Sequence, residues 1–346
     1  MTGKQNTPTI QHVAREAGVS TATVSRALTN PERVSEATRE RVALAVSKTG
    51  YTVNQSARSL RVRAARTLLI ALPNIGNPYY STILDAVVHE AASREYGVLV
   101  ANRLGADPNH WLRHFFFSNR ADGLLLFDGS LDPNLFQDLP SRDGVLPLVI
   151  SCDEVPSPGM HCVLTDNFEA GKRATQHLIE LGHRRIGHVI GRSKNSAPSE
   201  RMLGFRAAMA EAGLAVPDDW VVSGDFSMPS GIPAGEHYAR LRLRPSAVFC
   251  GNDEMAIGMI VGLRAHGLDC PRDISVVGFD DITVAAHYPP PLTTMRQPRE
   301  AMGRAATKML ISILEGEHRA SDTCHIVLKS HLVVRASTAR YIETTG

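Results

Sequence analysis

The chain has 346 residues, 43% hydrophobic and 21% charged, an ordinary composition for a globular protein of two or three domains. No apolar run approaches the ~20 residues of a membrane-spanning helix, and the polar N-terminus carries no signal-peptide core, so we expect a cytoplasmic protein without a membrane partner. The net charge of +2 is uneven, because residues 1–66 hold 11 basic and 4 acidic residues (+7), which leaves −5 for the remainder. A basic amino-terminal segment suits binding to a polyanion such as DNA.

The first predicted elements are two short helices joined by a tight turn within residues 9–28. The side-chain oxygen of Thr9 is expected to cap the first helix, Gly18 to end it, and Ser20 to cap the second. Apolar residues at helical spacing predict the buried faces, which are Ile10, Val13, Ala14 and Ala17 in the first helix and Val24, Ala27 and Leu28 in the second.

The opposite face of the second helix combines small or hydroxylated residues with one guanidinium group: Thr21, Ala22, Thr23, Ser25 and Arg26. Small residues let a helix lie deep in the major groove, hydroxyls reach phosphates, and arginine can bond guanine O6 and N7 together. The stretch therefore predicts a helix-turn-helix with its recognition helix second. An ordinary helical hairpin is the alternative.

A third helix is predicted from the Ser35 cap to about Lys48, with Gly50 ending it. Its inward residues are expected to be Val34, Thr38, Val42, Ala45 and Val46. Three helices on so small a core form a marginally stable DNA-binding headpiece, which we expect to be loose when it is not on DNA.

A basic segment follows the headpiece and predicts a short helix capped by Asn54. Ala57 and Leu60 lie one turn apart among Arg58, Arg61 and Arg63. In a dimer, two such leucines could wedge between base steps in the minor groove, with the arginines on phosphates. A disordered linker is the alternative, and we expect disorder in the free protein and a helix on DNA.

From Thr67 onward strands and helices alternate, beginning with the apolar run Leu68 to Leu72. This pattern predicts doubly wound parallel sheets with ligands at the carboxyl ends of the strands, in two lobes. Helices are expected at 79–96, 109–119, 167–181, 200–212, 230–241, 253–266 and 298–315. Strands are expected at 97–101, 122–127, 147–151, 162–165, 186–190, 220–223, 246–249, 274–278 and 325–335.

The ordered set of motifs over residues 9–340 resembles the lactose/galactose-repressor (LacI/GalR) family of bacterial transcription regulators. The matching fragments are Val13-Ala-Arg-Glu-Ala-Gly-Val-Ser-Thr-Ala-Thr-Val-Ser-Arg26, Val34-Ser, Thr38-Arg, Gly50-Tyr51, Asn54, Ala57-Arg-Ser-Leu60, Asn77-Pro-Tyr-Tyr80, Ala121-Asp-Gly-Leu124, Asp166-Asn167, Leu181-Gly-His-Arg184, Arg201, Gly204-Phe205, Asn252-Asp253, Val277-Gly-Phe-Asp-Asp281, Pro291-Leu-Thr-Thr294 and Gln297-Pro298.

The resemblance implies an all-α helix-turn-helix headpiece (1–53), a hinge helix or linker (54–66) and a two-lobed α/β effector domain like a periplasmic binding protein (67–340). The amino lobe would take about 67–164 and 295–323, and the carboxyl lobe about 165–292 and 324–340. The resemblance also implies a homodimer, since the tail after Arg335 shows no leucine heptad of the kind that tetrameric members carry.

In the headpiece the resemblance assigns sequence specificity to Thr21 and Ala22, a guanine contact to Arg26, phosphate contacts to Ser20 and Thr23, and the minor-groove wedge to Leu60. Together with the residues singled out above, the expected contacts to double-stranded operator DNA are Thr9, Ser20, Thr21, Ala22, Thr23, Ser25, Arg26, Asn54, Ala57, Arg58 and Leu60.

The resemblance places a small effector between the lobes, at Tyr80, Asn195, Arg201, Phe226, Asn252 and Asp280. The aromatic faces suit a sugar or a base, and Arg201, Asn252 and Asp280 suit hydroxyl groups. Asp153, after a strand end, is a weaker candidate, and Asp281 is expected to hold a loop. The expected effector is a sugar, a sugar acid or a nucleoside.

Other classes of function fit the sequence less well. It contains neither a P-loop, nor H-E-x-x-H, nor G-x-S-x-G, and its histidines and five scattered cysteines lack metal-ligand spacing, so we expect no enzyme, cofactor or metal. A solute-binding protein would leave the headpiece unexplained, and a regulator that responds to a nucleoside or purine remains an alternative. We expect a repressor whose effector changes DNA binding by shifting the dimer packing of the lobes.

Overall fold

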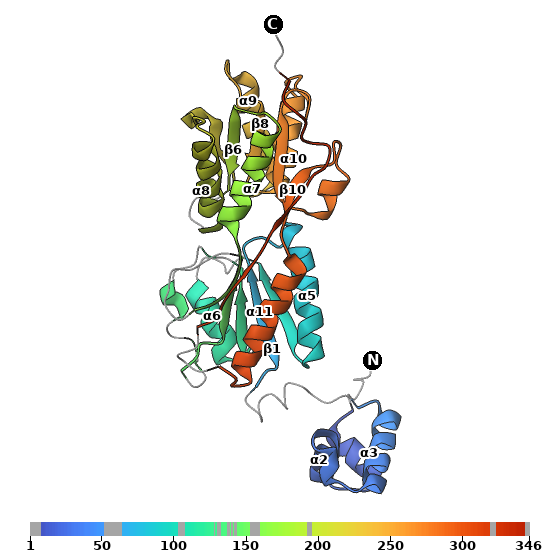
Figure 1. Ribbon diagram of the computed structural model, residues 1–346. Helices are drawn as coiled ribbons and strands as arrows, with labels where there is room; N and C mark the ends of the chain where they lie inside the picture. Colours follow the sequence, from blue (N-terminus) through green and yellow to red (C-terminus); the bar gives the residue numbers. More distant parts are fainter. Residues whose placement is uncertain are drawn as a thin grey trace. The chain divides into compact units, whose positions relative to one another are not determined.

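The computed structural model describes residues 8–51, 64–102, 108–127, 129, 133–136, 139, 141, 144–152, 160–191, 196–318 and 323–342 (Figure 1). The chain forms two compact units, residues 1–65 and residues 66–346. The predicted linker helix around Asn54 to Leu60 lies outside the described residues. None of the helices in the described ranges is both long and apolar enough to cross a membrane.

The first unit is a three-helix headpiece made of α1 (Ile10–Ala17), α2 (Thr21–Thr29) and α3 (Glu36–Thr49), with a short 3-10 turn, η1 (Pro31–Arg33), before α3. Its core contains the fully buried Val13 and Val24 and, from α3, Val42 and Ala45. Leu28, expected in this core, is 37% exposed. It lies one turn beyond Val24, near the end of α2, where the narrow contact between such short helices no longer covers it.

The amino lobe of the second unit is built on a six-stranded parallel sheet of order β11-β5-β4-β3-β1-β2. The strand β1 is almost wholly buried, as a strand covered on both faces must be. The elements of this lobe are β1 (Thr67–Leu72), α5 (Tyr79–Ser93), β2 (Gly97–Asn102), α6 (Pro108–Phe117), β3 (Gly123–Leu126), η2 (Pro133–Phe136), β4 (Leu148–Ser151), β5 (His161–Thr165), α11 (Arg299–Leu314) and β11 (His325–Leu328).

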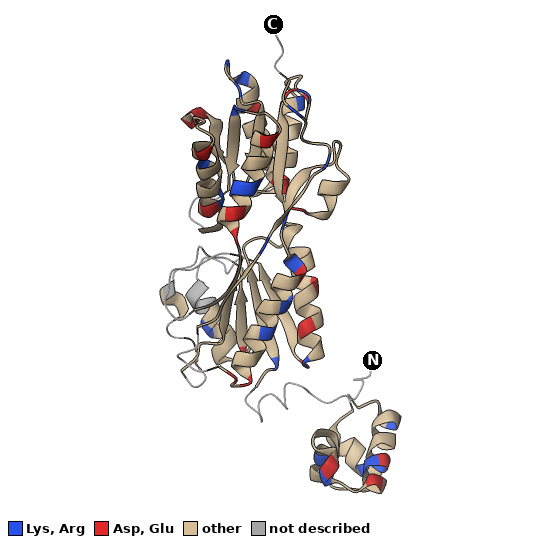
Figure 2. Ribbon diagram, in the orientation of Figure 1, with Lys and Arg blue, Asp and Glu red and all other residues tan. Residues whose placement is uncertain are grey.

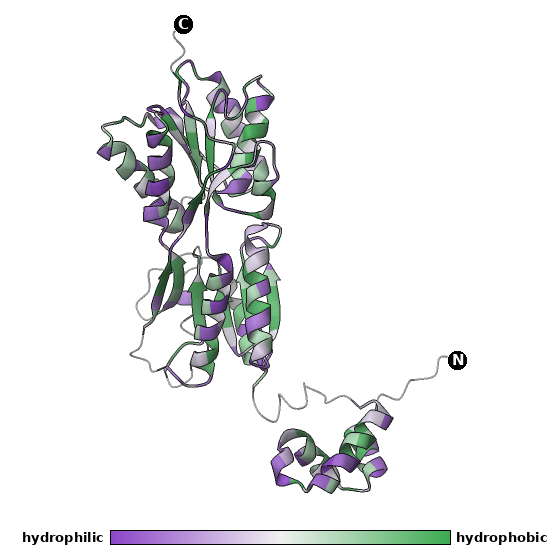
Figure 3. Ribbon diagram, turned by 45° about the vertical axis from the view of Figure 1, so that its right-hand side comes forward, coloured by the Kyte–Doolittle hydropathy of each residue, from purple (hydrophilic) through white to green (hydrophobic). Residues whose placement is uncertain are grey.

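The carboxyl lobe has a second six-stranded sheet, of order β12-β10-β9-β8-β6-β7, in which only the edge strand β12 is antiparallel. Figure 3 shows strands of hydrophobic colour in both lobes, with hydrophilic residues on the helices around them. The elements of this lobe are α7 (Asn167–Glu180), β6 (Ile186–Ile190), α8 (Ser196–Glu211), η3 (Asp218–Trp220), β7 (Val221–Ser223), α9 (Met228–Arg240), β8 (Ala247–Cys250), α10 (Asp253–Arg264), β9 (Ser275–Asp280), η4 (Thr283–Ala286), β10 (Thr293–Arg296) and β12 (His331–Val333).

The chain passes between the lobes three times, after β5, after β10 and after β11. The lobe boundaries expected from the resemblance put the last two passages at about 292–295 and 323–324, but the structure places both later in the chain, after Arg296 and after Leu328. The strand predicted over 325–335 is two strands, of which β11 joins the amino sheet and β12 the carboxyl sheet, and β10 lies in the carboxyl sheet. The apolar pattern of 325–335 contains neither Gly nor Pro, so nothing in it reveals that its halves belong to different sheets.

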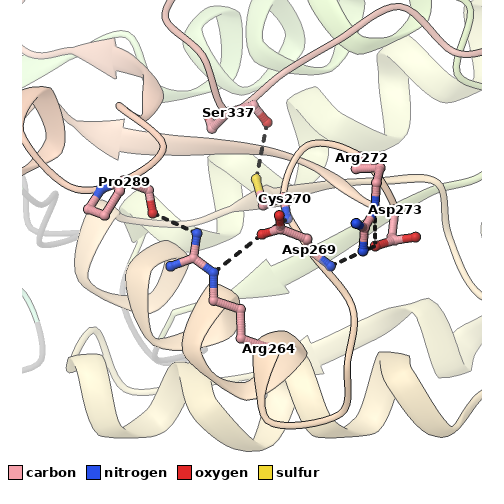
Figure 4. A network of polar contacts seen from close by, with 7 residues as sticks. All are labelled: Arg264, Asp269, Cys270, Arg272, Asp273, Pro289 and Ser337. Atoms are coloured by element: carbon pink, nitrogen blue, oxygen red, sulfur yellow. Dashed lines mark hydrogen bonds and ion pairs between the residues drawn. The ribbon is translucent and has the colours of Figure 1, made fainter.

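The segment around Ser337, which follows β12, is hydrogen-bonded to other parts of the carboxyl lobe. Ser337 is fully buried, and its hydroxyl donates to Val276 O (2.6 Å) and accepts from Thr293 N (2.8 Å). Figure 4 shows the loops that adjoin it: Cys270 Sγ lies 3.4 Å from Ser337 O, and Arg264 donates to Asp269 (3.3 Å) and to a backbone carbonyl (2.8 Å). The segment around Ser337 is therefore part of the carboxyl lobe.

Candidate nucleic-acid interface and ligand site

The recognition helix α2 begins as the sequence predicts. The Ser20 hydroxyl accepts from Thr23 N (3.1 Å) and lies 2.9 Å from Thr23 Oγ1, and Gly18 ends α1 with φ +64°. Thr9 is the N-cap of α1, as predicted, and forms a capping box with His12, whose Nδ1 accepts from Thr9 N (3.2 Å). The Thr9 carbonyl accepts from His12 N (2.9 Å).

The outer face of α2 carries the side chains that the sequence assigns to DNA. Thr21, Ala22 and Arg26 are exposed, whereas Thr23 and Ser25 are half-buried. Among the described residues Arg26 forms no ion pair, so its guanidinium keeps its fork of donors for another acceptor. Figure 2 shows the charged residues of this unit on its helices and on the turn between them. The other predicted contacts, Asn54, Ala57, Arg58 and Leu60, lie outside the described residues.

The predicted effector residues lie where strands end or helices begin in the second unit. Asp280 ends β9, Asn252 follows β8, Phe226 follows β7, Tyr80 lies in the first turn of α5, and Arg201 lies on α8. The carboxyl ends of parallel strands are the general place for a ligand in such sheets. Asp153 and Asn195 lie outside the described residues.

Arg201 is 6% exposed and is fixed on several sides. Its guanidinium lies 3.7 Å from the centre of the Phe279 ring, its Nε donates to Asn167 Oδ1 (2.8 Å), and an Nη donates to Gly251 O (2.6 Å). Close packing of α7 against α8 sets its backbone, since a Cβ added at Gly171 would lie 2.5 Å from Arg201 O. A buried cation held in this way is a rigid anchor for a polar ligand.

Asn252 makes two hydrogen bonds inside the protein. Its Oδ1 accepts from Met255 N (3.0 Å) and so caps α10, and its Nδ2 donates to Phe226 O (3.0 Å). Phe226 has a positive φ of +70°, and its ring packs against the backbone of Gly191, where a Cβ would lie 2.1 Å from Cζ. The asparagine thus positions the aromatic ring.

Asp280 is 4% exposed and accepts from Gln297 Nε2 (2.7 Å). Burial raises its pKa to about 6, although Arg201, Gln297 and Arg299 all act to lower that pKa. Its buried neighbour Asp253 has a structural role, because it accepts from Thr294 Oγ1 (2.6 Å) and Ile282 N (2.8 Å). Asp281 holds its loop, as expected, through ion pairs with Arg296 and Arg335, both at 2.6 Å.

Three buried residues that the sequence analysis did not assign join this site, namely Tyr79, Thr165 and Gln297. Gln297 Oε1 accepts from Thr165 Oγ1 (2.8 Å) and lies 3.2 Å from the Tyr79 hydroxyl, whose pKa is raised by burial. The predicted Tyr80 is half-buried, with its ring edge-on to Phe127 at 6.1 Å. Gln297 directly follows β10 (Thr293–Arg296), a strand that the sequence analysis did not predict.

A helix-turn-helix unit joined to a two-lobed α/β unit, with buried polar groups at the strand ends, defines a DNA-binding protein of the ligand-responsive type. Residues 9–54 match the family described as bacterial regulatory proteins, lacI family, and residues 175–338 match a periplasmic binding protein-like domain. The chain belongs to the LacI family of bacterial transcriptional regulators. Its curated relatives are repressors and not enzymes.

Two curated relatives match along nearly their whole length. The HTH-type transcriptional repressor PurR of Photobacterium profundum is 35% identical over 332 residues, which is 95% of this chain and 98% of the relative. The HTH-type transcriptional repressor CytR of Escherichia coli K12 is 34% identical over 345 residues, or 97% and 98% of the two chains.

Solved structures agree with this assignment. The lac repressor dimer bound to operator and the anti-inducer ONPF matches with a TM-score of 0.83 at 25% identity, over 96% of this chain and 99% of that one. The regulator CelR in complex with cellobiose matches with a TM-score of 0.72 at 32% identity, over 95% and 99% of the two chains. In the described part of this chain, no group of three or more His, Cys, Asp or Glu side chains is placed to hold a metal ion.

Proposed function

We propose that the chain represses transcription in the bacterial cytoplasm as a homodimer on a palindromic operator, and that a small carbohydrate-like effector bound between its lobes changes its affinity for that operator. The observation that carries the DNA-binding part is the outer face of α2, where Arg26 stands exposed among small and hydroxylated side chains. Selection of bound duplexes from a random pool tests it, with inverted half-sites as the expected product.

Dimerisation is supported by apolar side chains left exposed on both lobes of the second unit. Leu99 and Val100 are 40% and 42% exposed on the edge strand β2, and Val88 on α5 is 47% exposed. In the carboxyl lobe Val261 and Val284 are each 40% exposed. Exposed apolar side chains favour association between copies of a protein. Analytical ultracentrifugation of the full chain tests this part, and a monomer at micromolar concentration would contradict it.

The effector class is supported by Arg201 and Asp280, two buried ionic groups that suit hydroxyls, together with Tyr80 and Phe226, whose rings suit a sugar ring or a base. A nucleoside is the second candidate, because it presents a ribose and a flat base to the same groups. Thermal-shift measurements with ribose, cellobiose, cytidine and adenine separate the two classes, and operator titrations with each probe then test for regulation.

A further inference from the structure

The second unit contains a continuous buried hydrogen-bond chain that links the two ionic groups of the ligand site. Arg201 Nε donates to Asn167 Oδ1 (2.8 Å), and Asn167 Nδ2 donates to Thr165 O (3.1 Å). Thr165 Oγ1 donates to Gln297 Oε1 (2.8 Å), and Gln297 Nε2 donates to Asp280 Oδ1 (2.7 Å). Every member of this chain is at most 6% exposed.

The hydrogen-bond chain runs through the segments that join the lobes. Thr165 ends β5, where the polypeptide first passes to the carboxyl lobe, and Gln297 follows β10, where the polypeptide passes back to the amino lobe. The third passage touches the same place, since Asp166 N donates to Leu328 O (3.1 Å). Thr165 contributes twice to this chain, once through its carbonyl oxygen and once through its hydroxyl.

We propose that Thr165 is a positioning residue that ties Arg201 and Asp280 to the segments between the lobes, so that ligand contact and lobe arrangement change together. This proposal rests on the proposed function for its regulatory meaning. The two hydrogen bonds fix the orientation of the Gln297 amide. Its oxygen accepts from the Thr165 hydroxyl, so its nitrogen faces the Asp280 carboxylate. Without the hydroxyl, the amide oxygen of Gln297 keeps only the longer bond from the Tyr79 hydroxyl (3.2 Å) among the described residues.

The test uses three variants of the full chain. Thr165→Val removes the hydroxyl at nearly constant volume, and Thr165→Ser keeps it and should rescue. The control is Thr307→Val on α11, because Thr307 is also fully buried but its hydroxyl donates only to Gly303 O (2.8 Å) within its own helix.

The first readout needs no ligand. Hydrogen exchange of the Thr165→Val protein should be about fivefold faster at residues 79–84 and 280–285 than in the unmodified chain, a change that matches the loss of one buried hydrogen bond. The Thr307→Val and Thr165→Ser proteins should leave these residues unchanged. The proposal is overturned if exchange at these residues does not change in Thr165→Val, or if it changes equally in the Thr307→Val control.

The second readout is the ratio of operator Kd with and without ligand, at saturating concentrations of whichever of ribose, cellobiose, cytidine or adenine binds. Saturation removes the effect of weaker ligand binding, so a residue that only stabilises the fold or the ligand leaves this ratio unchanged. We expect Thr165→Val to reduce the ratio at least fivefold and Thr165→Ser to retain it. An unchanged ratio overturns the proposal. If no probe alters operator binding by the unmodified chain, the proposed effector function fails and hydrogen exchange alone decides the role of Thr165.

Discussion

The headpiece and the ligand site present their functional side chains in opposite ways. Thr21, Ala22 and Arg26 on α2 are exposed, whereas Arg201 and Asp280 are buried and bonded to several partners. A duplex is a large, uniform polyanion that an exposed helix face can meet, while a small ligand offers few contacts and must meet groups that are already fixed. The difference explains why the two regions respond differently to substitution.

The largest effect on stability is expected from a substitution in the core of the second unit. Phe249→Ala removes a fully buried ring that packs beside His188 and Phe279, and should lower the free energy of unfolding of this unit by about 3–5 kcal/mol. Urea unfolding followed by the fluorescence of Trp111 and Trp220, which both belong to this unit, measures it. The headpiece has its own core, so hydrogen exchange over 10–49 should not change, and a parallel loss there would show that the two units are not independent.

Next in size is the loss of the exposed guanidinium from the headpiece. Arg26→Ala should cost about 1–3 kcal/mol of discrimination between the selected operator and a scrambled duplex, with little change in stability, because few groups of the protein depend on this side chain. Arg33→Ala is the matched control, since Arg33 is exposed and has only a 3.9 Å ion pair with Glu32. Equal losses of discrimination in the two variants would contradict the assigned role of Arg26.

A comparison of helix caps should give smaller effects. Ser20→Ala removes the cap of α2 and should cost about 1 kcal/mol of headpiece stability, without any effect on ligand binding. Asn252→Ala removes the cap of α10 and the bond to Phe226 O, and should cost about 1–2 kcal/mol and weaken binding of whichever probe binds. Calorimetry of both variants separates these outcomes. An unchanged probe affinity in Asn252→Ala would contradict the proposal that Phe226 contacts the ligand.

Acidification should produce the smallest effect, again in the second unit. Burial lowers the pKa of His188 to about 4, and it also lowers the pKa values of His177 and His183. Below pH ~6.5 these three histidines therefore bind more protons in the unfolded chain than in the folded one. His188 alone should reduce the free energy of unfolding by about 1 kcal/mol between pH 6.5 and 5.5.

Urea unfolding of the unmodified chain and of His188→Phe at pH 7.5, 6.5 and 5.5 measures the His188 contribution as the difference between the two slopes. The pKa of Asp280, raised to about 6, and the raised pKa of Asp253 act in the opposite direction in both proteins, because the folded carboxyls then keep protons that the unfolded ones release. The headpiece, whose described part buries no histidine, should be less sensitive to pH over this range. An identical slope in His188→Phe would contradict the role of the buried imidazole.

The sequence predicts the headpiece well because its signals are local. Gly18 and Ser20 act within one turn of their own helices, and the exposed face of α2 follows from a 3.6-residue period. The prediction that Leu28 is buried was wrong, because periodicity indicates which way a side chain points but not whether a neighbouring helix extends far enough to cover it. In the second unit, strand and helix alternation predicts most of the elements, but neither the strand β10 nor the sheet that each half of 325–335 joins.

The ligand site could be predicted only in part. Asp280 and Phe226 follow strands, so their placement at the sheet edge follows from the fold class. Thr165 and Gln297 are 132 positions apart, and neither carries a periodic or spacing signal that would pair them. The inward role of Asn252 depends on the backbone of Phe226, a conformation with positive φ that the sequence does not indicate.

The late position of β11, β12 and Ser337 in the chain has a consequence for synthesis on the ribosome. The headpiece lies wholly within the first 65 residues, whereas each sheet lacks an edge strand until 325–333 have been made and the carboxyl lobe lacks its Ser337 anchor for longer still. Since a growing chain folds in the order in which its parts emerge, the headpiece is complete well before the second unit. A message truncated before residue 325 would therefore yield a chain with a complete headpiece and a second unit whose two sheets each lack an edge strand.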